Sequence, residues 1–531
     1  MNEKVQLITT TILPNNTLKI ELVCESTKEN EKQDLNIYFI DKNNEKYKAS
    51  YTYGDNIKAL LNVPVKEGTF NLYVNNNSKV EFVDNKNEKI VNKPNEYKIF
   101  TATNIINILE DGIIKIEKRR FGSKLKYEIH KQINSIKTLK RPCLLRLLKG
   151  KEKYFLFNDR LLYGDDSAEQ LFRYFNQNDK KIAKKCYFVL DKNAKCFNEI
   201  KKIGKVLKYG SVKHKIKYLN SKMVISSHAS YYDRVYNPFT EREMEFYKDI
   251  IHKKFVFLQH GVIMNDVHQF LQRSRIIADL FVTTTNDEEK IVKDNQYLYE
   301  NGVVACTGLP RFDKLVDKRK KVILISPTWR AYLTNVEYTN DKGNDFEESE
   351  YFKKYSSLLQ NKELQNYLKQ KNYQIKFLLH PAFQNFKEYF ENLNNKYVKI
   401  ILTKDIKYSD LFNECSIFIT DYSSIHFDVA FLKKPIIYYQ FDKNKFFESH
   451  YTKGYYDYEK DGFGEVIEQE KQIIEKIKYY IDNNCQIEEK YKKQIENTFR
   501  YLNRKNSERV YTQILKLDNK KDKIYRFNNV S

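Results

Sequence analysis

The alternation of apolar and polar positions divides the chain into a β-rich beginning and a longer region in which strands alternate with helices. Residues 1–104 contain short runs of β-branched and aromatic residues, separated by turns rich in Asn, Lys and Gly. This pattern is typical of a small β-sandwich, which we interpret as an accessory domain because it offers no catalytic constellation. Residues 105–150 are basic, and we predict a partly helical connector there.

From residue 151 the pattern predicts parallel α/β structure, because short apolar runs alternate with amphipathic stretches. We expect an N-terminal Rossmann-like domain over 151–317, a C-terminal one with terminal helices over 318–515, and a basic tail over 516–531. Ligands of such sheets bind beyond the carboxyl ends of the strands, so the site is expected in the cleft between the two domains. The expected strands lie at 154–157, 187–190, 222–226, 255–258, 280–283, 303–306, 322–325, 375–379, 399–402, 417–420 and 436–439.

The stretch 417–439 combines an apolar run, a polar turn, an apolar helix and a second apolar run. Its turn, Asp421-Tyr422-Ser423-Ser424, would present backbone N–H groups and the hydroxyls of Ser423 and Ser424 at the carboxyl end of a strand. These groups, with the positive end of a helix dipole, can bind a phosphate. An ordinary capped helix in an α/β core explains the same residues, and the stretch alone favours that simpler interpretation.

Histidines follow several of the predicted strands. His260 ends the string FVFLQHG, and His380 follows the strand at 375–379. A histidine at a strand end can act as a general base near neutral pH or contact a phosphate oxygen. A structural role explains any single one of them, but two on facing domains favour a functional site.

Two arginines lie in loops that follow strands. Arg311 lies in TGLPRFD and Arg330 in SPTWR. A guanidinium can neutralise a phosphate through two parallel hydrogen bonds. An interdomain hinge fixed by Gly and Pro explains these loops equally well, and both interpretations can hold together.

Composition narrows the classes of partner. The formal net charge of +23 attracts anionic polymers and membrane surfaces, whereas no RNA- or DNA-binding motif is present, so no nucleic acid is expected. Seven scattered Cys without a CxxC pair indicate a reducing, cytoplasmic protein. No HxH, HExxH or DxD-type pair lies beside the strands, so neither a metal nor a cofactor is expected. No apolar run is long enough to span a bilayer, so we expect any membrane association to be peripheral.

Six motifs in order carry a resemblance to a known family. They are FLQHGVIMND, TGLPRFDKL, ISPTWRAYL, FLLHP, ITDYSSIHFDVAFLKKPIIYYQFD and FFESHYTKGYYDYEKDGFGEV. Together the motifs make residues 154–515 resemble the CDP-glycerol glycerophosphotransferases, which prime or polymerise teichoic acids and related capsular polyol-phosphate chains. The β-rich region 1–104 is not covered by them.

The resemblance implies a GT-B fold and transfer of glycerol phosphate from CDP-glycerol to a hydroxyl of a membrane-linked or polymeric acceptor, with release of CMP. It also implies a location at the inner face of the bacterial cell membrane. Carried over by motif, His260 would be the base, beside Gly261, and His380 would contact the donor phosphates. The other implied substrate-binding residues are Arg311, Thr328, Arg330, Asp421, Ser423 and Ser424.

Two departures and two alternatives accompany the resemblance. The string HGVIMND lacks the Lys that family members often carry shortly after His-Gly, and Gly464-Glu465 replaces a usual Gly-Pro, a change expected to affect only a loop. The first departure leaves open one donor or acceptor contact and the identity of the polyol, and a CDP-ribitol or nucleotide-sugar donor on the same fold is one alternative. A non-enzymatic basic scaffold that binds anionic polymers is the other alternative.

Overall fold

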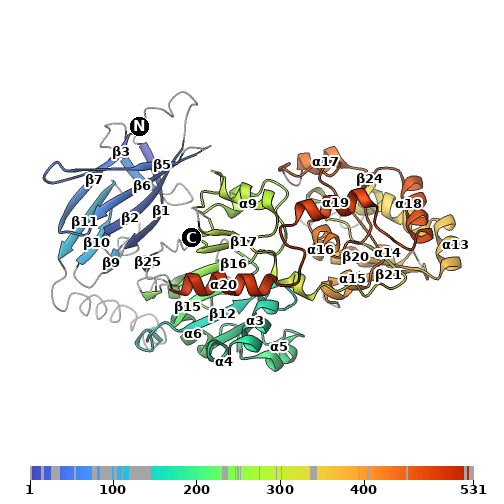
Figure 1. The fold of residues 1–531 in the computed structure, drawn as a ribbon, viewed down its shortest axis with the longest axis horizontal. Helices are drawn as coiled ribbons and strands as arrows, with labels where there is room; N and C mark the ends of the chain where they lie inside the picture. Colours follow the sequence, from blue (N-terminus) through green and yellow to red (C-terminus); the bar gives the residue numbers. More distant parts are fainter. Residues whose placement is uncertain are drawn as a thin grey trace.

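The structure, a computed structural model, forms a β-sandwich followed by two α/β domains (Figure 1). It describes residues 3–12, 17–25, 36–52, 56–74, 80–83, 98–100, 104–109, 112–118, 145–229, 237–244, 247, 250–251, 253–273, 275–294, 296–299, 302–334, 344–393, 395–403, 406–449, 452–519 and 523–525. Within these residues, no helix has both the length and the apolar content that crossing a membrane requires.

The sandwich packs two sheets around an apolar core, as predicted. Along β2, Leu18, Ile20 and Leu22 are fully buried on alternate positions, which places one face of the strand against the opposing sheet. One sheet has the order β25 (Lys523–Tyr525), β1 (Glu3–Ile12), β2 (Thr17–Glu25), β6 (Asn56–Pro64) and β5 (Ser50–Thr52), and β8 (Val80–Val83) pairs with β1 in parallel. The other runs β4 (Lys46–Lys48), β3 (Ile37–Asp41), β7 (Gly68–Val74), β11 (Ile113–Lys118), β10 (Asn104–Ile108) and β9 (Lys98–Phe100).

Strands β10 and β11 lie where a partly helical connector was expected. Ile114 and Ile116 of β11 are buried in the sandwich, and they alternate with Lys115 and Glu117. The charges made the stretch look like a connector, but the period of two is that of a strand with one buried face. Residues 119–144 of the expected connector lie outside the described residues.

The first α/β domain is built on a parallel sheet, as predicted. Its strand order is β14 (Val206–Lys208), β13 (Cys186–Leu190), β12 (Tyr154–Asn158), β15 (Ser221–Ser226), β16 (Lys254–Phe257), β17 (Leu280–Thr283) and β18 (Val304–Cys306). Its helices are α3 (Ser167–Asn178), α4 (Lys180–Ala183), α5 (Phe197–Ile203), α6 (Val212–Leu219), α7 (Glu241–Met244), α8 (His268–Leu271), α9 (Asn286–Lys293) and the 3₁₀ helix η4 (Pro310–Lys314). Because helices cover both faces, the central strands read as continuous apolar runs.

The second α/β domain repeats this plan. Its parallel sheet has the order β21 (Val398–Leu402), β20 (Gln374–Leu379), β19 (Val322–Ile325), β22 (Ile417–Thr420), β23 (Ile436–Tyr439) and β24 (Gly464–Ile467). Its helices are α10 (Ala331–Thr334), α11 (Asn344–Glu348), α12 (Glu350–Gln360), α13 (Lys362–Lys371), η6 (Pro381–Phe386), α14 (Lys387–Glu391), α15 (Tyr408–Glu414), α16 (His426–Phe431), α17 (Lys443–Ser449), α18 (Glu470–Asp482) and α19 (Glu489–Thr498).

Strand β24 corrects the expectation that Glu465 lies in a loop. Gly464 and Glu465 begin this edge strand, and Gly464 pairs with Ile436 of β23. A Cβ on Gly464 would lie 1.9 Å from the carbonyl oxygen of Ile436, so only glycine fits there. Glu465 pairs with Ile437 on this edge strand, a place where proline would also be tolerated.

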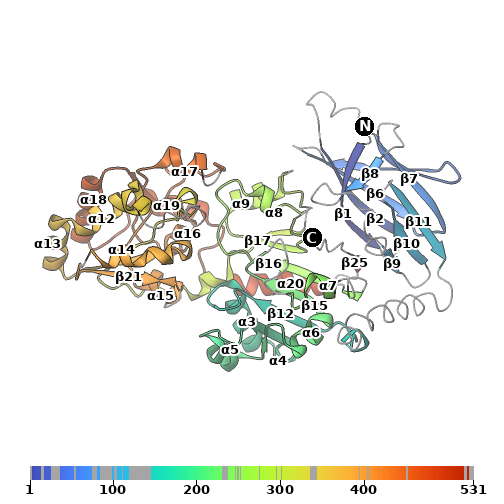
Figure 2. The ribbon, with the colours of Figure 1, turned by 180° about the vertical axis from the view of Figure 1, so that it is seen from behind.

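The last long helix returns to the first α/β domain. Figures 1 and 2 both show α20 (Asn506–Asn519) lying along that domain, away from α18 and α19. Val510 and Ile514 are buried there, and the hydroxyl of Tyr511 donates a hydrogen bond of 3.0 Å to Asp179. The helix therefore ties the two α/β domains together, although we expected terminal helices to stay with the second one.

A buried ion pair joins the sandwich to the first α/β domain. Arg273, which follows α8, lies 3.1 Å from Glu21 of β2, and both side chains are at most 5% exposed. Val23 of the same strand packs on Leu298. These contacts hold the accessory domain against the first α/β domain.

Candidate active site

The predicted functional residues gather where the carboxyl ends of the two parallel sheets meet. His260 follows β16, and Ser423 and Ser424 follow β22. A Cβ on Gly261 would lie 2.7 Å from Oγ of Ser424, so the two loops touch across the domain junction. Glycine permits this approach because any side chain at position 261 would displace the serine.

The imidazole of His260 stacks on a second imidazole. The ring of His228, which follows β15, lies 4.6 Å from that of His260 with an interplanar angle of 12°. Desolvation by the surrounding protein lowers the pKa of His260, although the residue itself is exposed; Asp166 opposes this effect. Burial lowers the pKa of His228 to about 3. Both rings are therefore neutral at pH 7, which is the state that a general base requires.

A buried carboxylate holds the loop that carries His260. Glu288 of α9 is fully buried, and its Oε1 accepts hydrogen bonds from Nε2 of Gln259 at 2.9 Å and from the backbone N–H of Ile263 at 2.7 Å. Its Oε2 accepts from the backbone N–H of Thr284. Gln259 has a φ of 61°, a strained conformation for this residue type, so these bonds fix a backbone shape that would otherwise relax.

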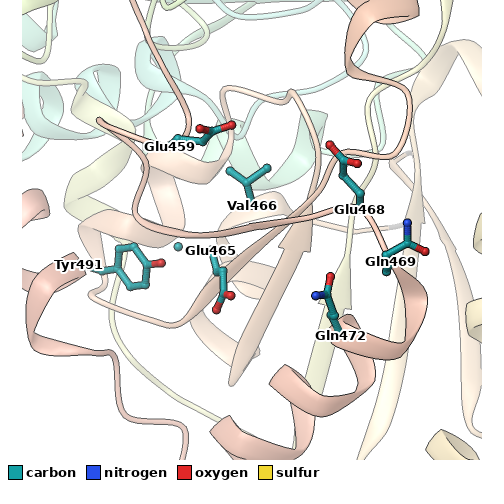
Figure 3. Close-up of a pocket in the computed structure, with 8 residues that line it drawn as sticks. Glu459, Glu465, Val466, Glu468, Gln469, Gln472 and Tyr491 are labelled. Atoms are coloured by element: carbon teal, nitrogen blue, oxygen red, sulfur yellow. The ribbon is translucent and has the colours of Figure 1, made fainter.

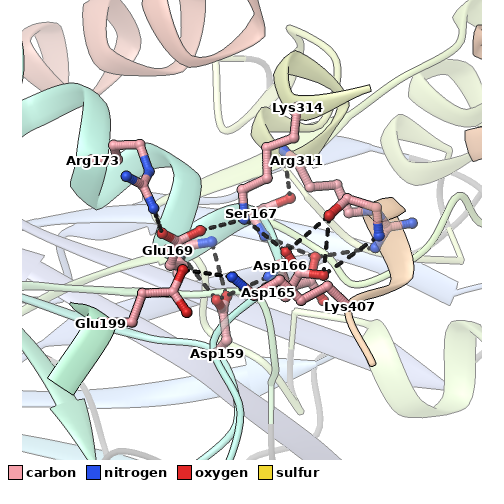
Figure 4. A network of polar contacts seen from close by, with 12 residues as sticks. Asp159, Asp165, Asp166, Ser167, Glu169, Arg173, Glu199, Arg311, Lys314 and Lys407 are labelled. Atoms are coloured by element: carbon pink, nitrogen blue, oxygen red, sulfur yellow. Dashed lines mark hydrogen bonds and ion pairs between the residues drawn. The ribbon is translucent and has the colours of Figure 1, made fainter. Parts of the chain in front are cut away.

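Arg311 joins the two domains instead of facing an open cleft. Nε and Nη2 donate to the two carboxylate oxygens of Asp428, at 2.8 and 2.7 Å, and Nη1 donates to Asp166 at 3.1 Å and to the backbone oxygen of His260 at 2.6 Å. Figure 4 shows this guanidinium within a network of carboxylates around the start of α3. The predicted phosphate ligand is thus an interdomain clamp in this structure.

The same network contains carboxylates that sequence reasoning missed. Asp159 is buried at the end of β12, where it accepts hydrogen bonds from Ala168 N–H at 2.9 Å and from the hydroxyl of Ser227 at 2.5 Å. Burial raises the pKa of Asp159 to about 7. Burial acts to raise the pKa of Asp166, but the permanent positive charge of Arg311 opposes this effect, and the net shift is downward. The available signals were the position of Asp159 just after β12 and that of Asp166 just before α3.

The Ser-rich turn is anchored by a second buried cluster. Arg330 is completely buried; its Nε and Nη2 donate to Asp442 at 2.7 and 3.0 Å, and Nη2 lies 2.9 Å from Asp421. Asp421 accepts the N–H groups of Thr328 and Tyr422 at 2.8 and 2.6 Å. Burial raises the pKa of Asp421, and Arg330 opposes that rise. Arg330 and Asp421 therefore hold the backbone of the turn from the protein interior, where neither side chain is exposed to a ligand.

Three hydroxyls lie at or beside this turn, on Ser423, Ser424 and Thr328. Ser423 and Ser424 are half-buried, and Ile425, not a serine, occupies the cap position of α16. Oγ1 of Thr328 is buried without a hydrogen-bond partner among the described residues. A buried hydroxyl without a partner is costly, so a ligand that accepts its hydrogen bond would be favoured here.

His380 lies just after β20, a strand of the same sheet as β22, which the Ser-rich turn follows. Its ring stacks on Trp329 at 6.0 Å, and its Nδ1 accepts a hydrogen bond from Ala382 N–H at 3.2 Å. The ring is half-buried. This bond requires an unprotonated Nδ1, so the neutral ring carries its proton on Nε2.

A separate pocket, shown in Figure 3, lies at the edge strand β24, and none of the candidate-site residues described above lines it. Its volume is about 410 Å³, and Glu459, Glu465 and Glu468 line it together with Tyr491 and Gln472. Three carboxylates repel phosphate, so this pocket does not suit a nucleotide diphosphate. Among the described residues, no three His, Cys, Asp or Glu side chains form a group that could hold a metal ion.

Two Rossmann-like sheets that share one site at their junction define a GT-B-like protein. The chain belongs to the family of CDP-Glycerol:Poly(glycerophosphate) glycerophosphotransferases, whose model matches residues 144–516. The resemblance inferred from the six motifs is thereby confirmed.

Similar proteins carry names from teichoic acid biosynthesis. The minor teichoic acid biosynthesis protein GgaB of Bacillus subtilis (strain 168) is 38% identical over 381 residues, which cover 70% of this chain and 41% of GgaB. The teichoic acid poly(glycerol phosphate) polymerase of Bacillus spizizenii (strain ATCC 23059 / NRRL B-14472 / W23) is 30% identical over 166 residues, 30% of this chain and 36% of the polymerase. The chain thus spans less than half the length of these relatives.

Solved structures of the wall teichoic acid polymerase TagF share the fold. One aligns with a TM-score of 0.53 and 16% identity, covering 74% of this chain and 97% of TagF. Another, of a TagF variant soaked with CDPG, gives a TM-score of 0.52 and 15% identity, covering 76% of this chain and all of TagF (100%). The predicted fold class is therefore confirmed.

Proposed function

We propose that this chain transfers glycerol phosphate from CDP-glycerol to a hydroxyl of a lipid-linked or polymeric acceptor and releases CMP. One observation carries the proposal: the loop with the neutral imidazole of His260 touches the turn with the hydroxyls of Ser423 and Ser424. This supports the proposal, because phosphoryl transfer needs a base and phosphate-binding groups held close together.

In the proposed reaction, His260 takes the proton of the acceptor hydroxyl as its oxygen attacks the phosphorus that bears glycerol. The bond from that phosphorus to the bridging oxygen breaks, CMP leaves with this oxygen, and the proton passes from His260 to solvent. Ser423 and Ser424 would donate hydrogen bonds to the phosphoryl oxygens, with Thr328 and the Nε2–H of His380 completing the donor side.

The arginines take part indirectly in this proposal. Arg311 would hold the two domains at the separation that the transfer needs, and Arg330 with Asp421 would fix the shape of the Ser-rich turn. Both guanidiniums already pair with two carboxylates, which supports positioning roles for them.

The test is product formation with CDP-glycerol and a glycerol-phosphate-primed lipid, followed by measurement of CMP. We expect His260→Ala to lower kcat by about 10²–10⁴-fold, the usual contribution of a general base. His268→Ala is the matched control, because His268 pairs with Asp266 outside this site. Turnover of His260→Ala at the wild-type rate would refute the assignment of the base.

The same assay decides between donors and examines the need for a cofactor. We expect CDP-glycerol to be preferred over CDP-ribitol and nucleotide sugars, and a glycosyl product without phosphate would refute the proposal. We also propose that no resident cofactor is required; activity lost in EDTA and restored by a divalent cation would contradict this.

We further propose peripheral association with the inner face of the bacterial cell membrane. Leu147 and Leu148 are 74% and 53% exposed, and Lys151 and Lys153 beside them are exposed as well. Apolar side chains next to cations suit an anionic lipid surface. Co-sedimentation with anionic vesicles, reduced in Leu147→Glu, is expected; binding unchanged by this substitution would contradict the proposed surface.

A further inference from the structure

Arg160 differs from the other arginines at the domain junction in having no carboxylate partner among the described residues. Arg311 pairs with Asp166 and Asp428, and Arg330 pairs with Asp421 and Asp442. Arg160 lies two residues after β12 and is exposed. Its Nε donates to Nε2 of His228 at 3.1 Å, an uncharged acceptor that leaves the positive charge unneutralised.

The side chain lies one imidazole ring away from the proposed base. His228 accepts the hydrogen bond from Arg160 and stacks on His260 at 4.6 Å. The charge of Arg160 contributes to the lowered pKa of His260, after desolvation. Across the junction, burial raises the pKa of Tyr408 on α15, and the charge of Arg160 opposes this rise. The guanidinium therefore acts on groups of both domains.

The backbone that carries Arg160 is held in place. Asp159, the preceding residue, is buried and accepts hydrogen bonds from α3 and from Ser227. Arg160 and Tyr163 exchange two backbone hydrogen bonds of 3.3 Å. A cation on a fixed loop loses little conformational entropy on binding an anion, which favours a binding role over a merely solvated side chain.

We propose that Arg160 binds a phosphate group of a substrate beside His260. The group is either the phosphodiester of the acceptor unit whose hydroxyl reacts or a phosphate of CDP-glycerol; its chemistry, a charged ester oxygen that accepts guanidinium hydrogen bonds, is the same. The nitrogens Nη1 and Nη2 are the donors, since Nε is held by His228. This inference rests on the proposed function and adds a cation that none of the six motifs contains.

The experiment measures kcat and KM of the full chain for each substrate in turn. The variants are Arg160→Gln, Arg160→Lys and the control Arg504→Gln, which removes an equal charge from another exposed arginine. We expect Arg160→Gln to raise one KM by about tenfold to a hundredfold, the loss of a charged hydrogen bond, with Arg160→Lys in between. A raised KM for the acceptor assigns its phosphodiester, and a raised KM for CDP-glycerol assigns the donor.

Ionic strength supplies a second readout. Salt is expected to raise the affected KM in the wild type and to raise it less in Arg160→Gln, because a screened charge pair has been removed. Two outcomes overturn the proposal: both KM values within twofold of the wild type, or a fall in kcat alone, which would mean that Arg160 acts through His228. Failure of the wild type to release CMP from CDP-glycerol would instead refute the proposed function, so the two failures are distinguishable.

Discussion

The two loops that meet at the proposed active site are each held by a buried carboxylate, but the partners of the two carboxylates differ. On the first α/β domain, Glu288 holds the loop of His260 through uncharged donors, the side-chain amide of Gln259 and backbone N–H groups. On the second, Asp421 holds the Ser-rich turn while paired with the fully buried cation Arg330. One carboxylate lacks a counter-charge, and the other has one.

This difference has consequences for the two loops. Burial raises the pKa of Glu288 to about 7, and only hydrogen bonds oppose this effect. A carboxylate without a cation is thus sensitive to pH, whereas an ion pair is sensitive to the loss of either partner. We call the loop of His260 the tunable half of the site, because pH changes the charge of the carboxylate that holds it. We call the Ser-rich turn the rigid half, because a buried ion pair holds it.

The largest expected effect is on the rigid half. Arg330→Met leaves Asp421 and Asp442 buried without their cation, so the free energy of unfolding should fall by about 3–5 kcal/mol. Urea denaturation measures the change. Arg319→Met is the control, because the pair of Arg319 with Asp317 is partly exposed and is worth at most about 1 kcal/mol. A loss no larger than that of the control would show that the buried cluster is not an anchor.

The next effect concerns the tunable half. The pKa of Glu288 is about 7 in the folded protein and 4.5 ordinarily. Between pH 4.5 and pH 7 the folded protein therefore keeps a proton on Glu288 that the unfolded protein releases. The contribution of Glu288 to stability is complete below pH 4.5 and is lost as the pH rises to 7, by about 3 kcal/mol. The difference in unfolding free energy between wild type and Glu288→Gln should therefore shrink over this range. A difference that stays constant with pH would contradict the argument.

A smaller effect is expected in kinetics. Glu288→Gln replaces an oxygen acceptor by an NH₂ group that faces backbone N–H donors, so the His260 loop should lose its fixed shape and kcat should fall about tenfold. The KM for CDP-glycerol should change little, because the Ser-rich turn is anchored separately. Glu289→Gln, which alters only ion pairs with Lys293 and Arg500, is the matched control. Equal kcat in both variants would remove Glu288 from the mechanism.

The smallest effect tests the contact between the halves. Gly261→Ala brings a Cβ to within 2.7 Å of Oγ of Ser424, so kcat/KM should fall. In a Ser424→Ala background the obstructing oxygen is gone, and the same substitution should cost about 1 kcal/mol less. Strictly additive effects of the two substitutions would show that the loops do not touch during turnover.

Much of this arrangement could be predicted because it rests on local pattern. The strands 322–325, 417–420 and 436–439 were predicted with their observed bounds, since doubly covered parallel strands are uninterrupted apolar runs. The meeting of the His260 loop with the Ser-rich turn, seen at Gly261 and Ser424, follows from the rule that ligand sites gather at the carboxyl ends of strands. The roles expected for His260, Ser423 and Ser424 come from the family resemblance.

The parts that could not be predicted depend on distant partners. Arg330 and Arg311 looked like phosphate ligands, but Asp442 and Asp428 occupy their guanidiniums. A sequence shows a charge and not whether its partner lies beside it in the fold. For the same reason the role of Glu288 was not predicted, because the residues that it holds, Gln259 and Ile263, are distant from it along the chain.

The strand β25 gives the molecule a particular order of assembly. Its residues Ile524 and Tyr525 pair with Thr11 and Thr10 of β1, so part of the first strand is completed by residues that are synthesised after both α/β domains. Until then this part of β1 presents unpaired backbone groups, a site where two nascent chains can join edge to edge. Pairing of this part of β1 therefore has to wait until residues 523–525 have been synthesised, so its rate is set by synthesis as well as by folding.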